Sequence, residues 1–163
     1  MIEIAGIRTE SLGDGTGVRT VIFFQKCTHY CYKCQNTDTW QEGNGQLVTI
    51  QYLLNIIKND VLSNGVTFSG GCPLCNSNLD QIILLAKEIK LLNKNIWCYC
   101  GEKIEELTGK QNELLQYIDV LIDGKYIDDL RNDTLAFRGS ENQRIIDVQK
   151  SLKKDKILSP GYK

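Results

Sequence analysis

The chain has 163 residues, 19 of them basic and 20 acidic, which gives a formal net charge of -1. This length predicts one domain, and the near-neutral charge argues against a strongly basic nucleic-acid surface, so no nucleic-acid partner is expected. The chain lacks an apolar run long enough to span a bilayer, and its first residues, MIEIAGIRTE, lack the apolar core of a signal peptide. We therefore expect a cytoplasmic protein without a membrane partner.

Seven cysteines are the most unusual feature of the composition. Their number is odd, so they cannot all pair with one another. In a reducing cytoplasm, clustered thiols indicate metal ligands or redox groups rather than disulfides. The single histidine of the chain, His29, lies among them.

Short β-branched and aromatic runs alternate with stretches of helical period along the chain. The expected elements, in order, are strand Val18–Phe24, helix Ile50–Asn59 capped by Thr49, strand Val66–Phe68, helix Leu79–Leu92, strand Ile96–Cys100, a broken helix over Glu102–Leu107 and Asn112–Tyr117, and strand Val120–Asp123. The alternation predicts an α/β fold with a mostly parallel sheet, as a layer or a partial barrel. Because no linker or repeat interrupts the chain, residues 1–163 are expected to form one domain.

Chemically distinctive residues follow each expected strand. They are Cys27, then Gly70 and Gly71, then Cys100 and Gly101, and finally Asp123, Gly124 and Lys125. Since active loops of parallel sheets lie at the carboxyl ends of the strands, the sequence predicts the functional site at that edge.

The strongest motif is the run Cys27-x3-Cys31-x2-Cys34 directly after the first expected strand. Three thiolates in so short a loop can surround one soft metal site. A tetrahedral zinc site would take a fourth ligand, for which His29 is available. A four-iron cluster would instead keep one iron open to another ligand. The spacing does not choose between these two sites.

This cysteine spacing after the first strand is the signature of the radical S-adenosylmethionine superfamily, and within it the chain resembles the activating proteins of anaerobic (class III) ribonucleotide reductase. The narrower resemblance rests on Asp14-Gly15-x-Gly17-x-Arg19, Asn36-x3-Trp40, Asn44-Gly45-Gln46, Ser69-Gly70-Gly71-x-Pro73-Leu74, Ile96-Trp97, Asp119-Val120-x2-Asp123-Gly124-Lys125 and Arg138-Gly139-Ser140-x-Asn142-Gln143-Arg144. It implies an open, partial β/α barrel of the radical S-adenosylmethionine type.

The resemblance implies a 4Fe-4S cluster held by Cys27, Cys31 and Cys34, with S-adenosylmethionine on the open iron. One electron from the cluster would cleave this cofactor to methionine and a 5'-deoxyadenosyl radical, which would take a hydrogen atom from a glycine of the reductase large subunit. The implied partners are that glycyl-radical subunit and a flavodoxin or ferredoxin-type reductant. No catalytic side chain beyond the cluster and the cofactor is implied.

Further cofactor-binding residues are implied by position, namely Lys33, Cys34, Gln35, Gly70, Gly71, Cys72, Asp123 and Lys125. Glycines let backbone amides approach a ligand closely, and an acid and a lysine offer complementary charges to the methionine zwitterion and the ribose. A plain turn and an exposed charge pair are the structural alternatives. The polar run from Arg138 to Arg144 is expected to shape the edge of the site or to meet the glycine loop of the partner, with a solvated loop as the competing interpretation.

The chain departs from the family pattern at two strand ends. The family has an acid after Gly-Gly that accepts hydrogen bonds from the cofactor, and Cys72 stands there instead. Cys100 replaces a threonine after the third expected strand. With Cys75 and Cys98 these make four further thiols, for which a second metal site, a redox pair and plain core packing remain open.

Two other functions also remain open. One is the activation of another glycyl-radical enzyme, although such activases are usually longer and lack the Arg-Gly-Ser-x-Asn-Gln run. The other is a non-catalytic zinc or iron-sulfur module.

Overall fold

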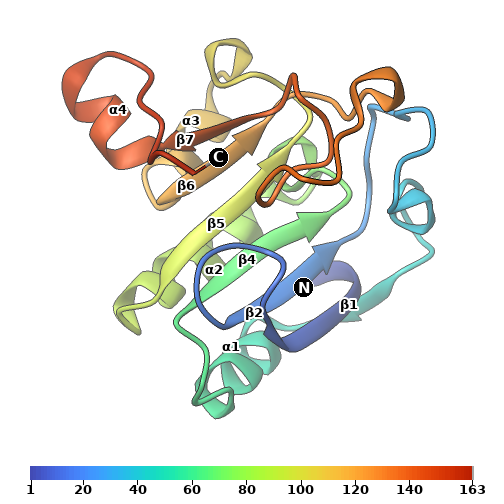
Figure 1. Cartoon of the computed structure of the whole chain (residues 1–163). Helices are drawn as coiled ribbons and strands as arrows, with labels where there is room; N and C mark the ends of the chain where they lie inside the picture. The colour runs from blue at the N-terminus through green and yellow to red at the C-terminus, as the bar shows by residue number, and fades with distance from the viewer. Residues whose placement is uncertain (163) are drawn as a thin grey trace.

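One seven-stranded sheet forms the centre of the computed structural model, which describes residues 1–162 (Figure 1). The strands are β1 (Ile2–Ser11), β2 (Arg19–Phe24), β3 (Gln46–Val48), β4 (Gly65–Gly70), β5 (Asn95–Cys100), β6 (Val120–Asp123) and β7 (Arg144–Asp147). The helices are α1 (Ile50–Asn59), α2 (Leu79–Leu91), α3 (Lys110–Leu115) and α4 (Val148–Lys154), with short 3-10 helices η1 (Thr37–Thr39), η2 (Pro73–Cys75), η3 (Ile104–Glu106) and η4 (Asp128–Leu130). Within the described part of the chain, none of the helices has the length and apolar character needed to cross a bilayer.

The strand order is β3-β1-β2-β4-β5-β6-β7, and β3 and β7 are free edges, so the sheet is open. The four central strands β2, β4, β5 and β6 run parallel, which confirms the predicted α/β class with a parallel sheet open as a partial barrel. The edge pairings of β1 with β2 and β3, and of β6 with β7, are antiparallel. The sequence did not predict β1, β3, β7 or α4: β3, β7 and α4 are short, and most of the later residues of β1 are exposed or half-buried, so its apolar pattern is weak.

The predicted helices are largely confirmed. The Thr49 side chain accepts a hydrogen bond from the Tyr52 amide and so caps α1. The broken third helix was predicted over too long a stretch. Its first half is only the single turn η3, whose Ile104 amide is tied to the Asp123 carboxylate. Its second half is α3, which begins after Gly109, where φ is +50°.

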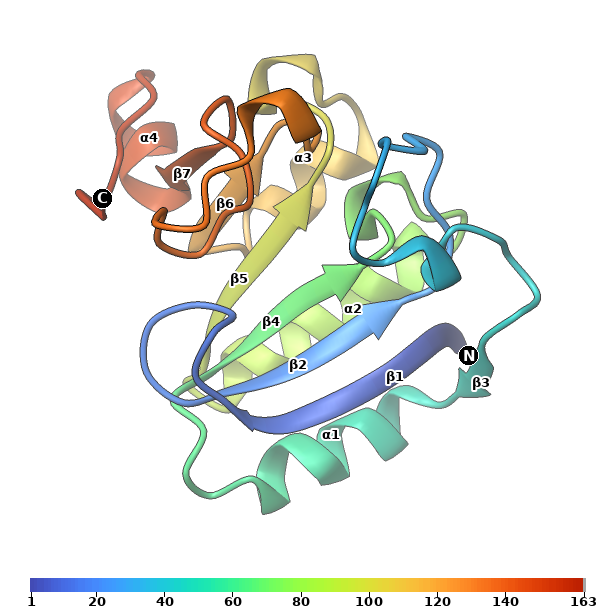
Figure 2. The same ribbon diagram turned by 45° about the vertical axis from the view of Figure 1, so that its right-hand side comes forward.

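The two faces of the sheet have different coverings. On β5, Ile96, Cys98 and Cys100 belong to the large core shared with the helices, whereas Trp97 and Tyr99 pack on the opposite side, as the period of a strand requires. Residues of α1 and α2 pack in the large core, and Figure 2 shows α2 behind the sheet, α1 below β1 and the loops 12–18 and 131–143 in front. Among residues 1–162, the front face is therefore covered by loops rather than by a layer of helices.

The run Asp14-Gly15-x-Gly17-x-Arg19 has a structural role on this front face. Arg19 is fully buried, and its guanidinium donates to Thr67 Oγ1 at 2.7 Å and to the Val66 carbonyl at 2.8 Å. Burial lowers the pKa of Arg19 to about 10. Gly15 has φ +135°, and a Cβ there would lie 2.7 Å from the Arg19 side chain. The glycine thus lets the loop close over the buried arginine.

Candidate metal and cofactor site

A cavity of about 640 Å³ opens beside the carboxyl ends of β2, β4, β5 and β6. We call it the site cavity. Its walls include Cys27, Cys31, Cys34, Gly70, Gly71 and Lys125. The parallel strands of the sheet therefore bring together residues that the sequence placed after four separate strands, at the edge where ligands of α/β sheets bind.

The segment 25–40, here called the cysteine loop, forms one wall of the site cavity. The amide of Cys27 donates to the Trp40 carbonyl at 3.1 Å, and this bond closes the loop at its base. The Cys34 amide donates to the Cys31 carbonyl at 3.0 Å, and Tyr30 and Lys33 have φ values of +47° and +56°. These left-handed residues reverse the chain tightly, so that all three cysteines of the loop reach the same cavity.

The three cysteines Cys27, Cys31 and Cys34, here called the triad, are half-buried and free. Burial raises the pKa of the Cys27 and Cys31 thiols. A soft metal overcomes this protonation because it binds the thiolate. The backbone amide of Asn36 lies 3.4 Å from Cys34 Sγ and donates to it.

The structure separates His29 from the triad. Two groups of described residues have ligand atoms that all lie within 4.8 Å of one another, and neither group includes a triad cysteine. One of these groups contains His29 instead. A single zinc ion with bonds of about 2.3 Å requires ligands that close, whereas a four-iron cluster takes each thiolate on a different iron. The described residues thus do not bring the triad and His29 together as one such close group, and a four-iron cluster does not require one.

The Gly-Gly pair after β4 is required by packing. Gly70 has φ +91°, and a Cβ there would lie 2.6 Å from the Phe24 carbonyl oxygen. A Cβ on Gly71 would collide with the Lys26 carbonyl. Both glycines also line the site cavity. Because the two glycines have no side chain, the end of β4 can approach the start of the cysteine loop closely. The same two residues form part of the cavity wall.

The other predicted cofactor-binding residues have different surroundings. Gln35 and Lys125 line the site cavity. Lys33 does not, and its ammonium group pairs with Asp128 at 2.8 Å on the surface. Cys72 is 1% exposed and lies in the core behind the cavity wall. The geometry thus brings together Gln35, Lys125, the glycines and the triad, but neither Lys33 nor Cys72.

Asp123 is fully buried and held by protein groups. Its Oδ1 accepts from Arg144 Nε at 2.9 Å, and its Oδ2 accepts from the Ile104 amide at 2.8 Å. Arg144 also forms a two-pronged pair with Glu105. The hydrogen bonds from Arg144 lower the pKa of Glu105 to about 2. The Asp123 carboxylate thus has its hydrogen-bond donors within the protein, from Arg144 of β7 and from the Ile104 amide. The charged residue near this strand end that lines the cavity is Lys125.

The polar run from Arg138 to Arg144 forms another wall of the cavity. Gln143 donates to the Gly124 carbonyl at 3.1 Å and accepts from the Gly139 amide at 2.9 Å, so the run folds back on the end of β6. Arg138 lines the cavity, and its buried Nε has no hydrogen-bond partner among residues 1–162. Sequence reasoning left an edge of the site, a contact with the partner's glycine loop and a solvated loop open for this run. The signal for a binding role was the arginine itself, but the unpaired nitrogen appears only in three dimensions.

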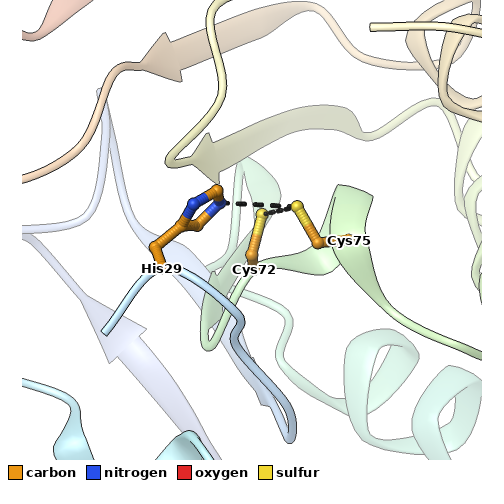
Figure 3. Close-up of side chains that lie close together, drawn as sticks. All are labelled: His29, Cys72 and Cys75. Carbon is orange, nitrogen blue, oxygen red and sulfur yellow. Dashed lines mark hydrogen bonds between the residues drawn. The ribbon is translucent and has the colours of Figure 1, made fainter. Parts of the chain in front are cut away.

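The remaining thiols divide into two kinds. Cys98 is fully buried in the core, and burial raises its pKa. Cys72, Cys75 and Cys100 instead meet one another beside His29. Cys72 Sγ lies 2.8 Å from Cys75 Sγ and 3.5 Å from Cys100 Sγ, and His29 Nε2 lies 3.4 Å from Cys75 Sγ. Figure 3 shows the imidazole directed at the two thiols of the Cys72–Cys75 segment.

We call His29, Cys72, Cys75 and Cys100 the thiol cluster. The neighbouring thiols of Cys100 and Cys75 hold the pKa of Cys72 well below its usual range. The same contacts raise the pKa of Cys100. Plain core packing accounts for Cys98 but not for the other three cysteines.

Comparison with known proteins gives a family match and one structural likeness. Residues 13–146 match a family model described as a 4Fe-4S single cluster domain. The crystal structure of QueE from Escherichia coli superposes with a TM-score of 0.49 over 75% of this chain and 69% of that chain, at 16% identity.

Three relatives share one name, anaerobic ribonucleoside-triphosphate reductase-activating protein. The protein from Haemophilus influenzae is 38% identical over 81% of this chain and 89% of its own length. The one from Escherichia coli is 37% identical over 80% and 88%, and the one from Enterobacteria phage T4 is 40% identical over 81% and 85%. The chain therefore belongs to the family of anaerobic ribonucleoside-triphosphate reductase-activating proteins.

Proposed function

We propose that this chain activates an anaerobic ribonucleotide reductase by generating a glycyl radical on its large subunit. The observation that carries the proposal is the convergence of the triad, Lys125 and Arg138 on one open cavity, in a chain of the activating-protein family. The site then needs two groups, a 4Fe-4S cluster and S-adenosylmethionine.

The triad fits the cluster. Three soft ligands reach the cavity from one closed loop, and a set of three leaves one iron for the cofactor. When bound, the cluster supplies the electron that cleaves S-adenosylmethionine to methionine and a 5'-deoxyadenosyl radical, which takes a hydrogen atom from a glycine of the reductase. The protein contributes ligation, orientation and shielding.

The charges of the cavity fit the methionine end of the cofactor. Arg138 Nε is a buried donor without a partner among the described residues, and Lys125 lines the same cavity. A carboxylate is the ligand that such a pair of cations binds best. Asp123 stays with Arg144 and positions this strand end rather than meeting the cofactor. Gln35 lines the cavity from the cysteine loop and offers an amide to the polar groups of the cofactor.

The aromatic side of the cavity excludes water from the reacting atoms. Tyr99 donates its hydroxyl hydrogen to the Phe137 carbonyl at 2.6 Å, and Phe137 packs edge-on against Trp97 at 5.1 Å between ring centroids. Tyr99 and Phe137 both line the cavity. This wall protects a reactive radical from solvent, while the open mouth admits a glycine-bearing loop of the partner. Electrons come from a flavodoxin or ferredoxin-type protein.

Anaerobic reconstitution with iron and sulfide tests the proposal. The reconstituted chain is expected to become brown, to cleave S-adenosylmethionine to 5'-deoxyadenosine when reduced, and to produce a glycyl radical, visible by electron paramagnetic resonance, on the large subunit of the reductase. A chain that binds no cluster, or that forms the cluster without cleaving the cofactor, contradicts the radical mechanism. Cofactor cleavage together with a radical only on another glycyl-radical enzyme contradicts the assigned partner.

A further inference from the structure

The thiol cluster lies outside the triad and is built from three separate segments. His29 comes from the cysteine loop, Cys72 and Cys75 come from the turn around η2 after β4, and Cys100 ends β5. The ligand atoms of His29, Cys72 and Cys75 all lie within 4.8 Å of one another. Cys100 Sγ lies 3.5 Å from Cys72 Sγ and belongs, with Cys75 and Glu102, to a second group of ligand atoms that lie within 4.8 Å of one another.

The donor set is that of a structural zinc site. Three cysteines and one histidine, with two of the cysteines in Cys-x2-Cys spacing, are a common tetrahedral ligand set for Zn²⁺. Zinc-sulfur bonds of about 2.3 Å place tetrahedral ligands about 4 Å apart. The contacts of 2.8 to 3.5 Å need only small side-chain rotations to reach that separation.

The backbone around the cluster makes room for the imidazole. Gly101 follows Cys100 directly, and an ideal Cβ on Gly101 would lie 2.6 Å from His29 Nε2. Any other residue at this position would push the ring away from the thiols. The glycine therefore lets His29 approach the ends of β4 and β5.

The cluster is partly closed to solvent: His29 and Cys75 are half-buried, His29 and Cys100 line the site cavity, and the other surfaces of the two buried cysteines face the core. Cys72 is 1% exposed and Cys100 is 4% exposed. The Glu102 amide lies 3.4 Å from Cys100 Sγ and donates to it, which stabilises a thiolate there. The Glu102 carboxylate also lies within 4.8 Å of the Cys75 and Cys100 sulfur atoms, but it accepts a hydrogen bond from the Gln111 amide at 2.9 Å. The imidazole, 3.4 Å from Cys75 Sγ and within 4.8 Å of Cys72 Sγ, is therefore taken as the fourth ligand.

We propose that His29, Cys72, Cys75 and Cys100 bind one zinc ion in a second metal site that is distinct from the triad. Binding forms three zinc-sulfur bonds and one zinc-nitrogen bond, and the three thiols release their protons to solvent. No electron is transferred, so no oxidant or reductant is needed. The site does not depend on the proposed radical chemistry.

The zinc site gives the cysteine loop a fixed anchor. His29 lies between Cys27 and Cys31 in the loop, while the other three ligands belong to the ends of β4 and β5. A bound ion would link the cysteine loop to the sheet through His29, which lies between two triad cysteines in the sequence. It also accounts for Cys72, which is buried in the core rather than facing the site cavity.

A disulfide between Cys72 and Cys75 is the competing use of the same thiols. It needs two sulfur atoms and leaves both the third thiol and the imidazole without a function. All four groups converge, and Gly101 is fitted to the imidazole, so the metal accounts for more of the geometry.

The test measures zinc and iron in the full chain, purified without oxygen and reconstituted with iron. A variant in which Cys27, Cys31 and Cys34 are all changed to serine is expected to lose iron but to retain one zinc per chain. In that background Co²⁺ is expected to give the visible spectrum of a tetrahedral thiolate complex. Cys75→Ser and Cys100→Ser are expected to reduce the zinc content at least tenfold, whereas Cys98→Ala, on the same strand, retains it.

The histidine variants separate ligation from folding. His29→Ala is expected to weaken zinc binding, and His29→Cys is expected to restore it with a stronger sulfur-to-cobalt absorption. Loss of zinc from the triple-serine variant, retention of zinc in Cys75→Ser, or a Cys72–Cys75 disulfide found by mass spectrometry in the anaerobic protein would overturn the proposal. If the protein cleaves the cofactor but binds no zinc, the zinc proposal is contradicted and the proposed function is not. If the protein binds zinc but does not cleave the cofactor, only the proposed function is contradicted.

Discussion

The triad and the thiol cluster are two sets of soft ligands on neighbouring parts of the molecule, and they form in different ways. The triad comes from one short loop, so closing that loop is enough to bring its thiols to one cavity. The thiol cluster comes from three segments that meet only when β2, β4 and β5 pair in parallel. Local spacing therefore encodes the first set, and sheet topology creates the second.

The largest expected effect separates the two sets by metal content. Cys31→Ala removes one of the three proposed cluster ligands, so iron content and 5'-deoxyadenosine formation are expected to fall to background. Cys75→Ser, the matched change in the thiol cluster, is expected to keep its iron and lose its zinc. Metal analysis of both variants after the same reconstitution checks this, and equal loss of iron from both would show that the two sets form one site.

A second pair of variants asks which lysine serves the site cavity. Lys125 lines the cavity, whereas Lys33 pairs with Asp128 outside it. Lys125→Met is expected to weaken S-adenosylmethionine binding by about tenfold or more, since it removes a charged hydrogen-bond donor. Lys33→Met serves as the control and is expected to change the affinity much less. Calorimetric titration of the cluster-loaded protein measures both, and a larger loss from Lys33→Met would place the cofactor against the outer side of the loop.

The substitution Gly101→Ala tests whether His29 is a zinc ligand of the thiol cluster. The added methyl group would overlap the His29 ring, which must then move away from the three thiols. Zinc affinity is expected to fall by about tenfold, the scale of changes that disturb a ligand without removing it. Competition with a chromogenic chelator measures this affinity. Unchanged zinc affinity would show that the imidazole is not a ligand, and iron content is expected to stay constant.

The smallest expected effect concerns an ion pair outside both sets. Arg144 lowers the pKa of Glu105 to about 2, below the ordinary value of 4.5. The pair therefore stabilises the fold above the ordinary pKa, and this contribution is lost as the pH falls toward 2. Because Glu105 is half-exposed, the contribution is about 1 kcal/mol or less. Denaturant unfolding of Glu105→Gln is expected to show this deficit at neutral pH but not near pH 2; a deficit that persists in acid would contradict the role of the charge.

Much of the fold was predictable because its centre repeats strong local patterns. The four parallel strands and the two long helices combine buried apolar runs with clear helical periods, and Thr49 supplies a cap. The strand β1 was missed although Ile2 and Ile4 are buried, because most of its later residues are exposed or half-buried and the strand resembles an ordinary terminal segment. The antiparallel addition of β7 was missed because Arg144, its first residue, belongs to a polar run and pairs with Asp123 across the sheet.

The sequence by itself determined the triad, its position after a strand and the family resemblance, because these depend on residue type and short spacing along one loop. Only the tertiary structure decided the partners of the other charged and sulfur-bearing residues. Asp123 and Lys125 are two residues apart, yet one is bound by β7 and the other lines the cavity. His29 lies within the triad in sequence, but it meets thiols more than forty residues away because Gly101 leaves space for its ring. Contacts between distant segments depend on the order of the strands in the sheet and on the side-chain volume where two segments approach each other. Neither can be deduced from the spacing of residues along one loop.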